Sequence, residues 1–127
     1  IKNNNLKNKV CVLNFIKNPF PYLKRADIFV LSSKYEGLPN VLLEALVLKK
    51  YVISSNCPTG PKEILNNGNY GSLFKISNYK ELSEKIIDYS KNKKARKTKI
   101  IKGFKSLDKY DFKNNCNKYL LTVKKYL

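Results

Sequence analysis

Short apolar runs that resemble β-strands alternate with helix-like segments along most of this chain. The clearest series is a strand at residues 27–32, a loop at 33–37, a helix from Pro39 to about Leu48 and a strand at 51–54. Because the connections are short, neighbouring strands are expected to run parallel, with helices between them. We therefore predict an α/β fold in which helices cover both faces of a parallel sheet. Ligands of such sheets bind beyond the carboxyl ends of the strands.

The other segments complete a single domain. Asn78 and Glu81 have the spacing of a helix capping pair, which predicts a helix start at this point. Further strands are expected at residues 10–13 and 72–74, the first of them buried, and further helices at 21–26, 62–65, 78–89 and 112–127. We interpret residues 1–127 as one domain, with its core at 10–90 and C-terminal helices at 91–127.

Several classes of chemistry are excluded by composition. The chain contains no histidine, so it has no Ser-His-Asp or Cys-His nucleophile system and no histidine metal ligand. Cys11, Cys57 and Cys116 lack the paired spacing of a zinc site, and their odd number argues against a disulfide framework. These unpaired cysteines favour a reducing cytoplasm, which is the location we expect. No stretch is long enough for a membrane span, and the chain shows no charged-then-apolar secretion signal.

The net charge of +17 suggests an anionic partner. Nearly all of the positive charge is lysine, and only Arg25 and Arg96 are arginine, the residue whose planar fork favours specific phosphate and base recognition. We therefore expect no nucleic-acid partner. The charge favours peripheral contact with an anionic membrane surface. The basic run at residues 91–99 would contribute to this contact.

Two carboxylates flank the predicted helix start. Glu36 lies in the loop and Glu44 eight positions later, with Gly37 and Pro39 between them. Free amides at a helix start, together with the helix dipole, favour an anion such as phosphate. Carboxylates repel phosphate but accept hydrogen bonds from hydroxyl groups. A nucleotide sugar, with phosphates between two hydroxyl-bearing rings, would satisfy both features.

Residues 26–45 resemble the donor-binding segment of family 4 retaining glycosyltransferases, which have the GT-B fold and are also described as glycosyl transferases group 1. The segment carries that family's E-x7-E signature at Glu36 and Glu44 with its usual surroundings. Residues 57–65 and 18–21 resemble the segments that follow and precede the signature. The resemblance covers roughly residues 10–90 and identifies the chain as the C-terminal, Rossmann-like donor-binding domain of such an enzyme.

The resemblance implies a role for each part of the signature. Glu36, the candidate catalytic residue, would contact hydroxyls of the donor sugar, and Glu44 would hold the ribose. Backbone at the helix start would meet the donor phosphates and sugar, at Gly37, Leu38, Asn40 and Val41. A less defined stretch would lie near the nucleobase, at Phe15, Lys17, Asn18 and Pro19. No metal and no cofactor are expected, since the donor itself is the substrate.

The same resemblance implies transfer of a sugar from a nucleotide sugar, UDP-linked in our prediction, with retention of anomeric configuration. The acceptor would be lipid-linked or a glycan, in surface polysaccharide, lipopolysaccharide or glycan assembly at the inner face of the membrane. The family's basic clamp for the diphosphate and its acceptor domain precede the matched region. We therefore expect a domain that is truncated at its N-terminus and inactive in isolation.

Two other classes stay open. One is a basic module that binds nucleic acid or a membrane surface without catalysis. The other is a sugar-nucleotide enzyme of similar architecture, such as a 2-epimerase.

Overall fold

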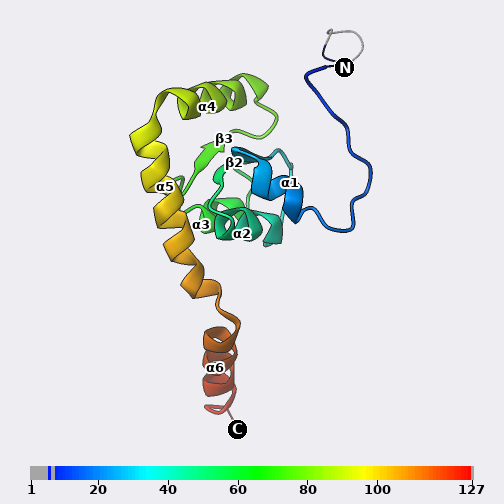
Figure 1. The fold of residues 1–127 in the computed structure, drawn as a ribbon. Coiled ribbons are helices and arrows are strands. Elements are labelled where there is room, and N and C mark those ends of the chain that lie inside the picture. The colour runs from blue at the N-terminus through cyan, green and yellow to red at the C-terminus, as the bar shows by residue number, and fades with distance from the viewer. Residues whose placement is uncertain (1–5, 7, 127) are drawn as a thin grey trace.

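The computed structural model describes residue 6 and residues 8–126. Its sheet has three parallel strands in the order β1-β2-β3, with β1 at Ile28–Leu31, β2 at Tyr51–Ser55 and β3 at Ser72–Phe74. Figure 1 shows the strands at the centre of the molecule, with helices above and below them. The parallel α/β architecture predicted from the alternation of elements is confirmed.

The helices follow the strands in the expected order. The α-helices are α1 (Phe20–Arg25), α2 (Asn40–Val47), α3 (Pro61–Ile64), α4 (Tyr79–Lys91), α5 (Lys93–Lys105) and α6 (Phe112–Val123), and a 3-10 helix, η2, spans Ser106–Tyr110. The Asn78 side chain accepts a hydrogen bond from the Glu81 amide at 3.1 Å, so the predicted cap of α4 is present. The basic run at residues 91–99 lies where C-terminal helices are expected: Lys91 ends α4, and residues 93–99 form the first part of α5.

Both faces of the sheet are covered by helices. Strand β2, at the centre of the sheet, is therefore buried along its whole length. Successive side chains of a strand point to opposite faces. Val52 packs with Leu42 and Leu46 of α2 in one apolar cluster, whereas Ile53 packs in a second cluster that includes Leu82 of α4. Each fully buried aliphatic side chain of this kind contributes about 1.5–3 kcal/mol. The prediction of helices on both faces is therefore confirmed.

The expectation of a buried strand at residues 10–13 is wrong. This segment is extended but unpaired, and Val12 is 73% exposed. Figure 1 shows it running away from the sheet. A strand is stabilised by pairing of its backbone groups with a neighbour, and this segment pairs with none of the three described strands. Apolar composition alone does not make the strand.

Helix α2 is less buried than its sequence suggests. We expected most sides of it to be covered, since its residues are apolar apart from Glu44. Leu42, Ala45 and Leu46 are buried, but Val47 is 54% exposed. The helix lies across one face of the sheet, so only the stripe facing the strands is covered.

Helix α5 contacts α2, on one face of the sheet, and α4, on the other. Lys99 in its middle donates a hydrogen bond to the Gly71 carbonyl at 2.7 Å, and burial lowers the pKa of this lysine, with nearby Lys85 adding to the effect. Farther along, an added Cβ at Gly103 would lie 2.8 Å from Leu46 Cδ2. A larger residue here would require the Leu46 side chain to shift, so glycine lets α5 pack closely where it crosses α2.

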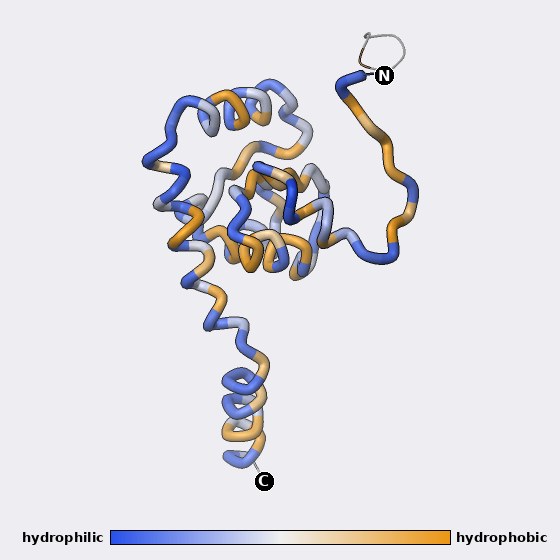
Figure 2. Tube along the Cα trace, viewed as in Figure 1, coloured by the Kyte–Doolittle hydropathy of each residue, from blue (hydrophilic) through white to orange (hydrophobic). Residues whose placement is uncertain are grey.

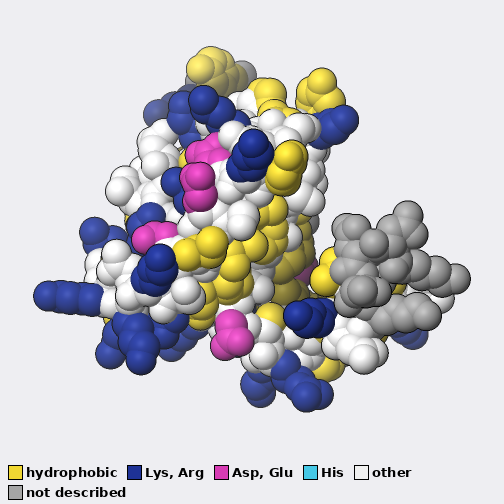
Figure 3. Space-filling model, turned by 90° about the horizontal axis from the view of Figure 1, so that it is seen from above, with side chains coloured by type: hydrophobic (Ala, Val, Ile, Leu, Met, Phe, Trp, Pro, Cys, Tyr) yellow, Lys and Arg dark blue, Asp and Glu magenta, His cyan; other side chains and the backbone are white. Residues whose placement is uncertain are grey.

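Helix α6 extends away from the body of the domain (Figure 1), with its start capped by Asp111. Its apolar residues form a continuous stripe in Figure 2, and Phe112 and Tyr119 are exposed. Seen from above (Figure 3), lysine and arginine side chains stand around a central band of hydrophobic side chains. Among the described residues, no helix combines the length and the apolar character that crossing a bilayer requires.

Candidate functional site

The loop between β1 and α2 lies at the edge of the sheet where the carboxyl ends of the parallel strands meet. Its helix begins at Asn40, one residue later than predicted, because Pro39 keeps an extended backbone (φ −72°, ψ 96°) and precedes the helix as its N-cap. Glu36 is half-buried in this loop and Glu44 is half-buried in the second turn of α2. The fold thus places the predicted loop at the ligand-binding edge.

Neither carboxylate is used within the domain. Among the hydrogen bonds of the described residues, none is accepted by the side chain of Glu36 or Glu44. A half-buried carboxylate without a partner is costly unless a ligand or water supplies donors. Both side chains are therefore available to bind hydroxyl groups.

The backbone amides at the start of α2 are also free. Leu42 donates to the Pro39 carbonyl at 3.0 Å and closes the first turn. Within the described chain, no hydrogen bond is donated by the four amides that the sequence singled out, those of Gly37, Leu38, Asn40 and Val41. An added Cβ at Gly37 would meet no atom within 4 Å, so the space on that side of Gly37 is open. The loop can accept an anion there.

A second loop, between β2 and α3, holds the first in place. The Ser55 hydroxyl donates to the Ser33 carbonyl, and the Cys57 thiol donates to the same carbonyl at 3.2 Å. The Thr59 hydroxyl donates to the Glu36 carbonyl. These side chains contact a loop more than 20 residues away in the chain, so the sequence analysis did not assign them to the site.

Gly60 completes this contact between the loops. Its φ is +83°, and a Cβ built there would lie 2.1 Å from the Gly37 carbonyl oxygen and 2.6 Å from Pro39 Cδ. Only glycine allows the two backbones to approach so closely. The Thr-Gly-Pro sequence at residues 59–61 is the signal that could have indicated this packing.

The predicted nucleobase stretch is only partly brought to the site. Phe15 is 95% exposed, Lys17 is exposed, and the Asn18 side chain accepts a hydrogen bond from the Phe20 amide at the start of α1. Pro19 lines an apolar hollow of about 300 Å³ together with Val41 of α2. Pro19 therefore lies beside the site helix, whereas the side chains of Phe15 and Lys17 are exposed to solvent.

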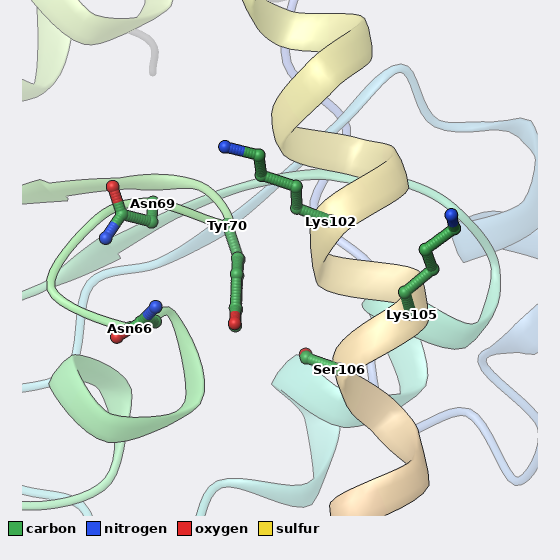
Figure 4. Close-up of a pocket in the computed structure, with 6 residues that line it drawn as sticks. All are labelled: Asn66, Asn69, Tyr70, Lys102, Lys105 and Ser106. Atoms are coloured by element: carbon green, nitrogen blue, oxygen red, sulfur yellow. The ribbon is translucent and has the colours of Figure 1, made fainter.

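Another hollow lies elsewhere. It measures about 490 Å³ and is lined by Asn66, Asn69, Tyr70, Lys102, Lys105 and Ser106. Figure 4 shows Lys102 reaching from α5 toward Asn69 and Tyr70, whereas the amine of Lys105 points along the other side of the helix. Residues 66–70 precede β3, so this hollow is at the amino edge of the sheet, away from Glu36. Among the described side chains, no three of His, Cys, Asp or Glu are grouped to hold a metal ion.

Sequence comparison relates the chain to known transferases. A family model described as "Glycosyl transferases group 1" matches residues 1–106. A Campylobacter jejuni relative named as an N-acetylgalactosamine-N,N'-diacetylbacillosaminyl-diphospho-undecaprenol 4-alpha-N-acetylgalactosaminyltransferase is 31% identical over 124 residues, which cover 95% of this chain and 34% of the relative. An uncharacterized glycosyltransferase of Methanocaldococcus jannaschii is 56% identical over 61 residues, 48% of this chain and 15% of that protein.

Solved structures share the fold. TarM aligns with a TM-score of 0.82 and 22% identity over 94% of this chain and 24% of its own. The C-terminal domain of a glycosyl transferase group 1 family protein, LpcC, from Francisella tularensis aligns with a TM-score of 0.67 and 27% identity over 79% and 53%, respectively. Anabaena Alr3699/HepE in complex with UDP aligns with a TM-score of 0.72 and 18% identity over 84% and 29%. The chain therefore spans 34% and 15% of the two curated relatives and about a quarter to a half of these structures.

Proposed function

This chain belongs to the glycosyl transferases group 1 family, and on that premise we propose that it forms the donor-binding part of an enzyme that transfers a sugar from a nucleotide sugar. One observation carries the proposal. At the carboxyl edge of the sheet, the β1–α2 loop and the first turns of α2 combine free backbone amides with two carboxylates that accept no hydrogen bond within the described chain. A sugar nucleotide needs both an anion site for its phosphates and hydrogen-bond acceptors for its hydroxyl groups. Few other ligands need both.

Charge assigns the roles within the site. The amides of Gly37, Leu38, Asn40 and Val41 take the phosphates, because backbone N–H groups at a helix start favour anions. Glu36 accepts hydrogen bonds from hydroxyls of the transferred sugar. Glu44, one turn into α2, accepts them from the ribose. These assignments keep each carboxylate on a neutral part of the donor and away from the phosphates.

The reaction we propose retains the anomeric configuration. The bond between the anomeric carbon and the leaving phosphate oxygen breaks, and the acceptor oxygen bonds to the same face of the sugar. The acceptor proton passes to the departing phosphate, so the site needs no histidine base. Glu36 acts by holding the sugar through the reaction.

The comparisons support a choice of substrates. UDP is the ligand named for the Anabaena structure of the same fold, and the Campylobacter jejuni relative is named for a diphospho-undecaprenol substrate. We propose a UDP-linked donor and a lipid-linked or glycan acceptor, in surface polysaccharide, lipopolysaccharide or glycan assembly. A further part of a longer protein would bind the acceptor and would supply the basic residues that clamp the diphosphate.

Titration of the chain with UDP and UDP-sugars, followed by calorimetry or NMR, tests the donor site. Losing a hydrogen bond to a charged group weakens binding by about 10-fold or more. Glu36→Ala should therefore weaken binding of UDP-sugars and leave UDP nearly unaffected, whereas Glu44→Ala should weaken binding of both. Glu84, an exposed residue of α4, supplies the matched control Glu84→Ala. Unchanged binding in both site variants would refute the proposal.

Peripheral contact with an anionic membrane is a separate proposal that rests on the charge of +17. Lysines near an anionic surface contribute about 1 kcal/mol each, and the effect is screened by salt. Co-sedimentation with vesicles should increase when anionic lipid is included and fall as salt is raised. Equal sedimentation with neutral vesicles would contradict it. Salt-sensitive binding to nucleic acid instead, unaffected by Glu36→Ala and Glu44→Ala, would favour the non-catalytic alternative.

A further inference from the structure

The β2–α3 loop contacts carbonyl groups of the β1–α2 loop. Thr59 donates to the Glu36 carbonyl, and the backbone of Gly60 lies against the Gly37 carbonyl. Two consecutive carbonyl groups of the site loop are therefore directed toward the same neighbouring loop.

The orientation of these carbonyls fixes the orientation of the amides. In a planar trans peptide, the C=O of one residue and the N–H of the next point in opposite directions. With its carbonyl held by Thr59, the Glu36–Gly37 peptide directs the Gly37 N–H away from the β2–α3 loop. The contact at Gly60 does the same for the Leu38 N–H. Both donors then point away from the β2–α3 loop.

Gly37 makes this external restraint necessary. Glycine leaves room for a ligand, but it also has more backbone freedom than any other residue, so the peptides around it rotate readily. Within the described chain, the Gly37 and Leu38 amides make no hydrogen bond that would hold them. Contacts to the carbonyl side of these peptides must hold them instead.

We propose that Thr59 is a positioning residue for donor binding, which holds the Gly37 amide toward the donor phosphate through its hydrogen bond to the Glu36 carbonyl. This inference rests on the proposed function. Thr59 itself is exposed, so its hydroxyl contributes little to the stability of the domain. Removing it should therefore weaken ligand binding and leave folding nearly unchanged, and serine should replace it because serine keeps the hydroxyl.

The experiment uses the full 127-residue chain labelled with 15N-glycine. Five glycines give five backbone amide signals, and the Gly37 signal is identified by its loss in Gly37→Ala. UDP is the probe. In the unsubstituted chain the Gly37 signal should move during the titration. Thr59→Val should weaken UDP binding roughly five- to tenfold, the equivalent of one neutral hydrogen bond, and Thr59→Ser should stay within about twofold.

Thr98 provides the matched control. Its hydroxyl donates to the Lys94 carbonyl at 3.1 Å within α5, away from the site, so Thr98→Val should bind UDP as tightly as the unsubstituted chain. Urea unfolding of each variant checks that folding is retained.

The outcomes separate the two proposals. If the unsubstituted chain does not bind UDP, the proposed UDP donor itself is refuted. If it binds and Thr59→Val binds equally well, the positioning role is refuted. Equal losses of UDP affinity in Thr59→Val and Thr59→Ser would also overturn the positioning role, because the effect would not depend on the hydroxyl. A Thr59→Val chain with the amide spectrum of an unfolded protein would overturn it too, because the effect would then come from lost folding.

Discussion

Replacing Gly60 with alanine tests the close approach of the two loops that build the site. A methyl group at this position would lie 2.1 Å from the Gly37 carbonyl oxygen and 2.6 Å from Pro39 Cδ. Both contacts are far shorter than van der Waals separations, and neither partner is the end of a flexible side chain. The backbone of the β1–α2 loop would have to move away.

Two costs add at this position. A φ of +83° is strained for any residue with a Cβ, and such strain costs about 1–3 kcal/mol. Displacing well-packed backbone costs a further amount of about 1–3 kcal/mol. The expected loss in the free energy of unfolding is therefore about 2–6 kcal/mol, a large part of the roughly 5–15 kcal/mol that stabilises a typical domain.

Gly68 separates these two costs. Its φ of +89° is similar, but an added Cβ there would meet no atom within 4 Å. Gly68→Ala should therefore lose only the backbone term of about 1–3 kcal/mol. Urea unfolding measures both variants, and a slope of about 1–3 kcal/mol per M converts each loss into a shift of the midpoint. If Gly60→Ala is no less stable than Gly68→Ala, the inferred packing of Gly60 against Gly37 is wrong.

Three further substitutions give distinct readouts. Gly37→Ala should leave urea unfolding nearly unchanged and weaken UDP binding in a calorimetric titration, because its methyl group enters only the open space beside Gly37. Asn78→Ala should lower the free energy of unfolding by about 0.5–2 kcal/mol in the same urea assay, since it removes the cap of α4. Burial raises the pKa of Tyr51 above its ordinary value of 10.0, so its stabilising contribution is complete below that pH and is lost as pH rises through the folded pKa. Between about pH 9 and about pH 11, the free energy of unfolding should therefore fall less steeply with pH in Tyr51→Phe than in the unsubstituted chain.

The central part of the fold was predictable because local signals and tertiary environment agree there. Residues 51–54 have the β-branched and aromatic composition of a strand, and the structure buries that segment between two helical layers. The run at residues 10–13 has a similar composition but no strand beside it in the described sheet, and it stays unpaired. Composition reports the tendency of a segment to be a strand, whereas pairing depends on the rest of the sheet.

The candidate site was predictable to a similar extent. The free amides at the start of α2 and the place of Glu36 in the preceding loop follow from Pro39, Gly37 and the strand before them. The contacts from Thr59 and Cys57 could not be derived in this way, because they join loops that are distant in sequence and meet only through the parallel pairing of β1 and β2. Short-range patterns therefore locate the candidate ligand-binding groups, and topology supplies the neighbouring groups that contact their loop.

The two glycines of the site show how these levels depend on one another. Gly37 is free of neighbours on the side where a Cβ would stand, and the absence of a side chain there would leave room for the proposed ligand. Gly60 has the opposite surroundings, because its missing side chain gives another backbone access to it. The freedom that Gly37 needs for binding would allow its peptides to rotate, and the contact at Gly60 limits that rotation. A loop that must be both accessible and rigid therefore needs a second loop, and the parallel sheet provides one at the carboxyl end of the next strand.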